Sequence, residues 1–379
     1  MQVSTESAPT AGHNGTIFVA IELSQKTWLV TLHSPDRDRI SRHKLEGGDH
    51  GGLLELIRKV EARAAEKLGW APRVVSCYEA GYDGFWLHRL LQAAGITNFV
   101  FDAASIAVEQ RSRRAKTDRI DGELMLRTLM AYLRGEPRVV RIVRAPSVVE
   151  EDVRRTSRER DRLVKEQTAH SNRIKALLRL LGVAVGTPRR QNWLAWLEQQ
   201  RDWQGQPLPP HLLAEIKREH ARLMLVREQI ATLEQAQVAE VPDAMSERRQ
   251  LLQRLKALGP AFSATLVNEL FYKDFRNRRE VAAYCGLAPS PWKSGGIDLE
   301  QGISKAGNHR ARHKAIELAW LWLRHQPDSA LSRWFRNRTA NAGKRARRIA
   351  IVALARKLIV ALWRYLSTGL VPDQATMKA

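Results

Sequence analysis

The sequence has little that could form disulfides or cross a membrane. Its 379 residues include only two cysteines, Cys77 and Cys285, which form no CxxC pair, so we expect neither a disulfide framework nor a zinc cluster. No apolar run reaches the roughly 18 residues of a membrane span, because Arg356 and Lys357 interrupt the nearest one at 349–363. The first residues are small and polar and lack the apolar core of a secretion signal. We therefore expect a cytoplasmic protein with no membrane partner.

Acidic residues are also scarce. Asp and Glu number 40 against 62 Lys and Arg, which gives a formal net charge of +22. Such an excess favours a polyanionic partner, of which nucleic acid is the commonest, over a merely soluble or ribosomal-type basic protein. Hydrophobic residues make up 44% of the chain, enough for packed cores, and the length suggests two or three domains.

The first third alternates between strand-like and helix-like patterns, after a polar tail at 1–14. Apolar strands are expected at 17–23, 27–33, 40–45, 73–80 and 98–103, and helices at 53–69, 85–95 and from about 117 to 135. A hairpin followed by alternating strands and helices predicts an α/β domain over 15–146, with helices packed on a mixed sheet.

The remainder is predicted to be helical. Residues 147–245 contain two long, charged, helix-periodic segments, 148–182 and 207–237, typical of a helical hairpin or coiled coil that pairs with a second copy. Residues 246–379 read as a mostly α-helical domain with basic helices at 302–325 and 343–367. The Gly259–Pro260 turn fits either a phosphate-binding helix–hairpin–helix or a plain helical turn.

Four carboxylates occupy the ends of predicted elements in the first domain. Glu22 and Glu79 end strands, and Asp118 and Asp121 lie three apart at the start of a helix, so they share a face. Singly, each is explained as an exposed strand end or a helix-capping residue. Together they follow the order of an RNase H-like nuclease, where carboxylates hold Mg²⁺ or Mn²⁺ for phosphodiester chemistry.

The stretch GLAPSPWKSGG, residues 286–296, is an ordinary turn or the site of a nucleophile. Ser294 precedes two glycines that would let a large ligand approach, but a serine hydroxyl needs activation and no His–Asp pair adjoins it. Ser290, before a proline, is typical of a turn, and Ser304 resembles a helix cap. Spacing alone does not decide which of the three serines is the nucleophile.

Basic residues surround this stretch. His309 and His313 lie four apart without the Glu of an HExxH zinc motif, so they predict no metal site. The cations are either a solvated face or phosphate contacts. The candidate nucleic-acid contacts are Lys116, Lys293, Lys305, Arg310, Arg312, Lys314, Lys344, Arg345, Arg347 and Arg348.

Several motifs together resemble one family. VAIELSQKTW, YEAGYDGFWLHRLL and RRAKTDRIDGELM are similar to the N-terminal domain of IS110/IS1111-type DEDD transposases. VAAYCGLAPSPWKSGG and GISKAGNHRARHKAIELAW resemble the C-terminal domain of that family. The resemblance covers nearly the whole chain in the right order.

The resemblance implies a RuvC-like N-terminal domain whose Asp-Glu-Asp-Asp set binds Mg²⁺ and a C-terminal serine that attacks DNA to form a phosphoserine linkage. The set carries over to Glu22, Glu79, Asp118 and Asp121, and the serine to Ser294. Glu22 stands where the family has Asp, and ALGP at 257–260 stands where it has a PGIG-like turn. Glu22 therefore leaves open that this protein is a family member with reduced activity.

The family further implies donor and target DNA as partners, a homodimer or homotetramer and, in some members, a structured guide RNA encoded by the element. Such a protein would act on the bacterial nucleoid. Two rival functions stay open: a metal-dependent junction nuclease without a covalent intermediate, and a non-catalytic nucleic-acid-binding protein derived from a transposase.

Overall fold

The computed structural model describes residues 15–81, 84–106, 118–188, 192–239, 243–294 and 297–378, and within these the side chains of 118–120, 237–239, 243–244, 292–294 and 297–301 are not described. The predicted tail at 1–14 lies outside the described residues. The chain divides into two compact units, with the boundary between Pro146 and Ser147.

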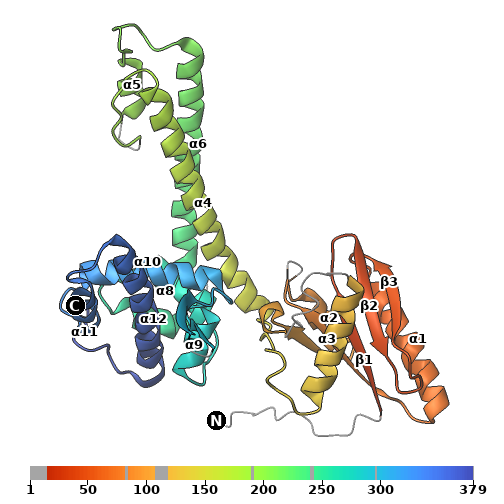
Figure 1. The fold of residues 1–379 in the computed structure, drawn as a ribbon. Coiled ribbons are helices and arrows are strands. Elements are labelled where there is room, and N and C mark those ends of the chain that lie inside the picture. The colour runs from red at the N-terminus through yellow and green to blue at the C-terminus, as the bar shows by residue number, and fades with distance from the viewer. Residues whose placement is uncertain are drawn as a thin grey trace. The chain divides into compact units, whose positions relative to one another are not determined.

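The first unit contains a mixed sheet of five strands in the order β3-β2-β1-β4-β5 (Figure 1). The strands are β1 (Thr16–Glu22), β2 (Thr27–His33), β3 (Ser41–Glu46), β4 (Arg73–Glu79) and β5 (Thr97–Phe101). β1 pairs antiparallel with β2 and parallel with β4, which in turn runs parallel to β5. The predicted α/β arrangement is confirmed, and each predicted strand agrees with an observed one to within two residues.

Alternation along the strands divides this unit into two cores. Ile17, Val19 and Ile21 of β1 point to one face, where α1 (His50–Leu68) and α2 (Trp86–Ala93) cover them. Phe18 and Ala20 point to the other face and pack against α3 (Asp118–Leu133). The central strands β1 and β4 are therefore buried on both faces, whereas the edge strand β3 is partly exposed.

The second unit begins with a long helical hairpin. Helix α4 (Val148–Arg179) starts with a capping box in which the Ser147 hydroxyl accepts from the Glu150 amide, while Glu150 accepts from the Ser147 amide. It packs along α6 (Pro210–Ala239), and the short α5 (Trp193–Glu198) lies near the turn. The ion pairs Arg160–Glu234 and Arg173–Glu215 show that the two helices are antiparallel.

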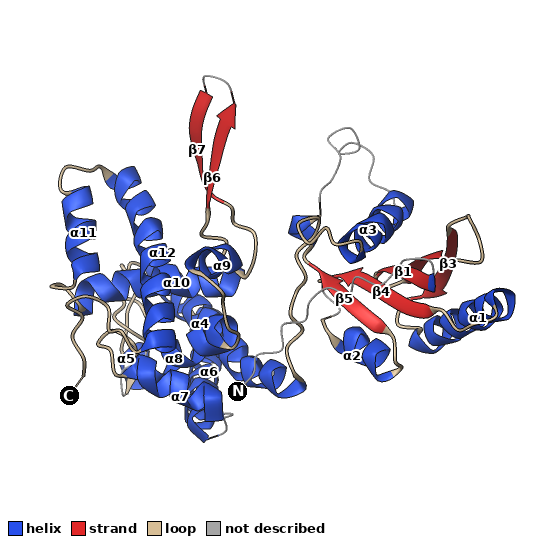
Figure 2. Cartoon of the chain, turned by 90° about the horizontal axis from the view of Figure 1, so that it is seen from below, coloured by secondary structure: helices blue, strands red, loops and turns tan. Residues whose placement is uncertain are grey.

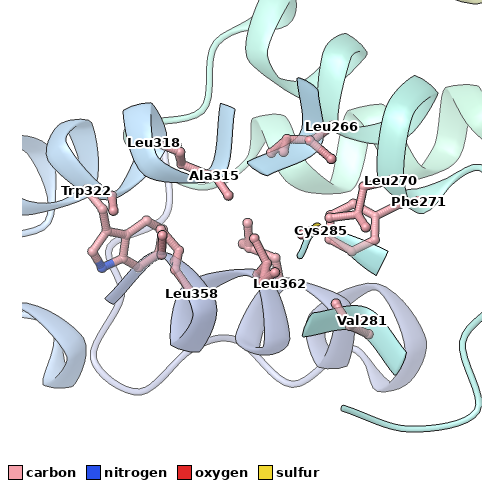
Figure 3. Close-up of a cluster of buried hydrophobic side chains, with 14 of the residues drawn as sticks. Leu266, Leu270, Phe271, Val281, Cys285, Ala315, Leu318, Trp322, Leu358 and Leu362 are labelled. Atoms are coloured by element: carbon pink, nitrogen blue, oxygen red, sulfur yellow. The ribbon is translucent and has the colours of Figure 1, made fainter. Parts of the chain in front are cut away.

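The rest of the second unit is a helical core joined to a β-hairpin. Leu266, Ala315, Trp322 and Leu358 are buried together at its centre (Figure 3). The elements are α7 (Asp243–Gln253), α8 (Pro260–Leu266), the π-helical turn η4 (Val267–Phe271), α9 (Arg278–Tyr284), β6 (Pro289–Ser294), β7 (Ile297–Ile303), α10 (His309–His325), α11 (Ala330–Thr339) and α12 (Lys344–Thr368). No helix within the described residues has the length and apolar character needed to span a bilayer.

The structure corrects the prediction around residues 286–308. The basic helix predicted at 302–325 begins only at His309, because Asn308 is its N-cap and accepts from the amides of Arg310 and Ala311. Ser304 is therefore not the cap, and residues 289–294 of the stretch 286–296 form the strand β6 rather than an ordinary turn. The Gly259–Pro260 turn does start a helix, with Gly259 as N-cap of α8.

Candidate functional site

Glu22 and Glu79 lie at the same edge of the sheet. Strands β1 and β4 are parallel neighbours in which Ile21 is opposite Tyr78, so the next residue of each strand, a glutamate, comes at its carboxyl end. Two residues earlier on each strand, Ala20 and Cys77 belong to the core under α3. Because side chains alternate along a strand, both glutamates are directed to the α3 face.

The first turn of α3, which contains Asp121, approaches the same face of the sheet closely. A Cβ atom added to Gly122 would lie 2.5 Å from Thr31 Oγ1 and 3.9 Å from Leu29 Cδ2. Thr31 pairs with Ala20 and Leu29 pairs with Glu22 across the sheet. The residue before this glycine is Asp121, so the first turn of α3 lies over the carboxyl end of β1.

These carboxylates suit a divalent cation in donor type, because Mg²⁺ takes oxygen ligands. Asp118 begins α3, but its side chain is outside the described set. Among the side chains that are described, no group of three or more His, Cys, Asp or Glu residues is close enough to hold a metal ion. What the structure shows is that Glu22 and Glu79 end neighbouring parallel strands and that the first turn of α3 packs on the same face of the sheet.

Two neighbouring groups have other roles. Glu123, in the same turn of α3, forms an ion pair with Arg42 of β3. The Cys77 thiol is buried and approaches the carbonyl oxygen of Met125 at 3.8 Å. Burial, with a further contribution from the Glu79 carboxylate, raises the pKa of this thiol well above its usual value, so it is not a thiolate nucleophile at neutral pH.

Ser294 is the last residue of β6, at the outer end of the β6–β7 hairpin. It pairs with Ile297 of β7, so only residues 295 and 296, which are outside the described residues, connect the strands. Figure 2 shows this hairpin extending away from the helices of its unit. The rival Ser290 lies near a register shift between Pro289 and Pro291, and Ser304 follows β7 at the base of the hairpin.

The base of the hairpin is held by backbone contacts between residues 284–288 and 304–308. The amides of Ser304 and Asn308 donate to the carbonyl oxygens of Ala288 and Tyr284 at 2.8 and 2.7 Å. Gly286 and Gly307 have φ of +63° and +95°, and a Cβ atom at either would collide with the opposite backbone. Both positions therefore need glycine.

The Arg312 side chain reinforces this base. Its Nη1 donates to the carbonyl oxygens of Cys285 and Lys305, at 3.2 and 2.9 Å. One guanidinium therefore joins the two segments that carry β6 and β7, and the direction of the hairpin is fixed at its root.

A cationic groove of about 1140 Å³ borders the same root. Pro289, Gly302 and Ile303 line it at the hairpin end, and apolar residues of α12 such as Val352 and Val360 form its floor. Asp373 is the only carboxylate among its described lining residues. The cations that line it are Arg278, Arg279, Lys305, Arg345, Arg348, Arg356, Lys357 and Arg364. None of the eight forms an ion pair with a carboxylate in the described part of the chain.

The predicted nucleic-acid contacts therefore fall into two groups, those that line the groove or face solvent and those that bind other parts of the protein. Lys305, Arg345 and Arg348 line the groove, while Lys344 and Arg347 are exposed at the start of α12 and Arg310 is half-buried in α10. In contrast, Arg312 holds the hairpin base, and Lys314 is only 12% exposed and pairs with Asp161 and Glu317. Lys116 and the side chain of Lys293 fall outside what is described.

Sequence reasoning missed several of the groove cations. Arg278 and Arg279 begin α9, and Arg356, Lys357 and Arg364 belong to α12. In the sequence, Arg356 and Lys357 interrupt an apolar run, which by itself does not indicate a groove. The spacing of Arg345, Arg348, Arg356 and Arg364 at near-helical intervals is the signal that could have found this face.

Comparisons with known proteins show to which family the chain belongs. The model of the DEDD transposase family of IS110 type, described as a transposase, matches residues 19–182, and that of the "Transposase IS116/IS110/IS902 family" matches residues 249–334. A Sinorhizobium fredii protein named "Putative transposase y4rJ" is 47% identical over 376 residues, which cover 96% of this chain and 95% of that protein.

More distant relatives carry similar names. A Pseudomonas aeruginosa protein named "Probable family 20 transposase" is 31% identical over 234 residues, 60% of this chain and 67% of the relative. The "Transposase for insertion sequence element IS1111A" of Coxiella burnetii is 28% identical over 236 residues, 60% of this chain and 62% of that protein. On the near full-length match and the two family models, the chain belongs to the IS110 family of insertion-sequence transposases.

Proposed function

We propose that this protein is a site-specific DNA recombinase in which Ser294 attacks the DNA strand and a divalent cation assists at the carboxylate edge. The observation that carries the proposal is the position of Ser294, at the outer end of a hairpin whose root borders the cationic groove. A DNA strand bound along the groove would have its phosphates next to the element that carries the nucleophile.

The chemistry is a transesterification. The Ser294 hydroxyl oxygen forms a bond to phosphorus, the bond from phosphorus to one deoxyribose oxygen breaks, and that oxygen takes up a proton. The phosphoserine keeps the phosphodiester, so attack by a deoxyribose hydroxyl of another strand rejoins DNA and regenerates the serine without an energy source.

Glu22, Glu79, Asp118 and Asp121 would hold the metal, as Mg²⁺ or Mn²⁺. When bound, it would stabilise the charge that develops on the phosphoryl oxygens and favour deprotonation of an attacking hydroxyl. Glu22 reaches one methylene further than an aspartate would, so these side chains must adjust to keep the same donor positions.

The groove supports donor and target DNA as partners. Within the described part of the chain its eight cations have no ion pair with a carboxylate, so their charges repel one another until a polyanion neutralises them. Lys344, Arg347 and Arg310 add charge outside the groove. This excess of positive charge also suits binding of a structured guide RNA. Copurification of a single defined RNA species with the protein would support such a guide.

We further propose that the α/β unit (15–146), the helical arm (147–245) and the C-terminal helical part (246–379) act as metal, assembly and nucleophile domains. Met224 and Leu225 of α6 are exposed apolar side chains on the arm, which supports pairing of arms in a homodimer or homotetramer. The setting would be the bacterial cytoplasm, on the nucleoid.

The test is transfer of labelled DNA to protein. Wild-type protein incubated with end-labelled DNA and Mg²⁺ is resolved by denaturing electrophoresis, and a labelled protein band is expected from wild type and from Ser290→Ala and Ser304→Ala. Ser294→Ala should give no band while still binding DNA. A band from Ser294→Ala would refute the nucleophile assignment. Cleavage without any band in wild type would favour the junction nuclease.

If the protein is instead a non-catalytic nucleic-acid-binding protein derived from a transposase, it should bind DNA without cleaving it. Neither wild type nor Glu22→Asp would then cleave DNA with Mg²⁺ or Mn²⁺, although both would bind it. Cleavage by either protein excludes that alternative.

A further inference from the structure

A buried carboxylate lies outside both candidate centres. Glu269 belongs to the π-helical turn η4, and its side chain is only 2% exposed. π-Helical turns are rare and frequently mark functional positions within helices. A buried charge is costly unless it is paired and hydrogen-bonded, so the partners of Glu269 indicate what it does.

The first partner is on the arm. Arg158 of α4 donates from Nε and Nη2 to the two carboxylate oxygens of Glu269, at 2.7 and 3.1 Å. Burial alone would raise the pKa of Glu269, but the hydrogen bonds and charges of its partners, Arg158 first, lower it below the usual value. The group is therefore an ionised carboxylate held in a two-bond fork.

The second partner is at the hairpin base. Asn308 Nδ2 donates to the Glu269 backbone oxygen and to its Oε2, both at 3.0 Å. The Oδ1 of the same amide caps α10, and the Asn308 amide N–H donates to the Tyr284 carbonyl oxygen at 2.7 Å. Glu269 thus joins α4, through Arg158, to the segment that carries β7.

Neighbouring contacts make this junction stiff. Arg154 Nε donates to the Asn268 carbonyl oxygen at 2.9 Å, and its guanidinium lies 3.9 Å from the centre of the Tyr272 ring. Asn268 Nδ2 donates back to the Val153 carbonyl oxygen at 3.1 Å. Rotation of α4 about its axis would therefore displace η4.

We propose that Glu269 is a positioning residue that couples the α4–α6 arm to the β6–β7 hairpin and so sets where Ser294 stands. The inference rests on the proposed role of Ser294. Stability alone is a weaker explanation, because a buried ion pair commonly adds little over an apolar replacement, whereas this one joins two segments whose relative position decides where the hairpin points.

The main variant is Glu269→Gln, which keeps an acceptor for Asn308 but removes the charge that holds Arg158. The matched control is Glu219→Gln. Glu219 also ties α4 to another helix, through His170 Nδ1 at 2.7 Å, and is 14% exposed, but it has no contact with the hairpin base. Arg158→Lys is the milder second variant. It keeps the positive charge on a side chain that is 42% exposed and removes only the two-bond contact with the Glu269 carboxylate.

Two readouts are measured on the full-length protein. The first is hydrogen exchange at the amides of residues 304–311, which should quicken by about tenfold in Glu269→Gln and stay unchanged in Glu219→Gln. The second is formation of the covalent protein–DNA adduct. Its rate at saturating DNA should fall by about tenfold or more, because small misplacements of a nucleophile are costly. The DNA concentration at half-saturation should stay within about twofold, since a positioning defect spares binding.

The outcomes separate the two proposals. If wild type and Glu219→Gln form no adduct at Ser294, the proposed function fails. If they do form it and Glu269→Gln matches their rate, or if its exchange at 304–311 equals that of wild type, Glu269 does not position the hairpin. Should Glu269→Gln not fold, Arg158→Lys decides by the same two readouts, with an intermediate loss expected and wild-type behaviour overturning the inference.

Discussion

Gly122 of α3 lies directly against Thr31 of β2, so close that a Cβ atom at Gly122 would be 2.5 Å from the threonine Oγ1. This contact sets the depth at which the first turn of α3, with Asp121, approaches the end of β1. Glycine is a poor helix former, so the position is occupied for its lack of a side chain rather than for helix stability.

We expect Gly122→Ala to destabilise the first unit by about 1–3 kcal/mol, because the overpacking outweighs the better helix propensity of alanine. Urea unfolding followed by circular dichroism measures the loss. Thr31→Ala in the same chain should recover most of it, because it removes the obstructing hydroxyl and methyl groups. Additive effects of the two substitutions would show that the contact does not limit packing.

Metal binding should depend on Glu22 and not on Glu123. Glu22→Gln removes a proposed metal ligand from the carboxylate edge, and we expect Mg²⁺- or Mn²⁺-dependent cleavage to fall by about 100-fold, the upper end of the loss seen when groups around a metal are removed. Glu22→Asp should retain cleavage. Calorimetric titration with Mg²⁺ or Mn²⁺ measures metal affinity directly and does not require activity.

The matched control for this prediction is Glu123→Gln. Its carboxylate is in the same turn of α3 as Asp121 but pairs with Arg42, so its loss should leave metal affinity unchanged. Equal weakening of metal binding by Glu22→Gln and Glu123→Gln would mean that Glu22 is not a ligand.

The groove makes a quantitative prediction about salt. Each cation that neutralises a duplex phosphate contributes about 0.9 to the slope of log affinity against log salt concentration, so Arg345→Gln with Arg348→Gln should reduce that slope by about 1.8. Fluorescence anisotropy with labelled DNA at several salt concentrations measures it. Arg324→Gln, at an exposed cation outside the groove lining, serves as control. An equal decrease in both proteins would place DNA elsewhere.

Asp36 should make the first unit sensitive to acid. Its side chain is 1% exposed, and Arg63 donates to it from Nε at 3.1 Å. Burial works to raise its pKa, but hydrogen bonds from Ser34 and Arg63 and the charges of Arg63 and Lys67 prevail and lower it from 3.8 to about 2. Since the folded state holds the carboxylate more strongly in its charged form, the stabilisation is complete above pH 3.8 and disappears as pH falls towards 2.

Asp36→Asn should therefore have a lower free energy of unfolding than wild type at pH 7, and this difference should disappear near pH 2. Unfolding by urea at a series of pH values tests this, with Asp38→Asn in the same loop as a control. A constant difference between Asp36→Asn and wild type across the series would contradict the assignment.

Much of the fold was predictable because its signals are local. Alternation at 27–33 matches β2 from Thr27 to His33, and the capping pattern of Ser147 with Glu150 marks the start of α4. Glu22 and Glu79 stood out because each ends an apolar strand. That the carboxylates belong to one edge could be expected from strand order, and the parallel pairing of β1 with β4 agrees.

The hairpin was not predictable in the same way. Pro289 and Pro291 are poor strand residues, and β6 forms because its root is held by contacts that join 284–288 to 304–308. The groove likewise combines cations from α9, the segment after β7 and α12, which no window of sequence brings together.

The sequence by itself determined the order of helices and strands, the basic charge and the family motifs, because periodicity, capping and composition act over a few residues. Only the tertiary structure decided that Lys314 pairs with Asp161, that Ser294 ends a hairpin, and that Glu269 joins segments 111 and 39 residues away from it. The physical reason is that burial of a charge requires partners, and those partners come from whichever distant segments the packed core brings beside it.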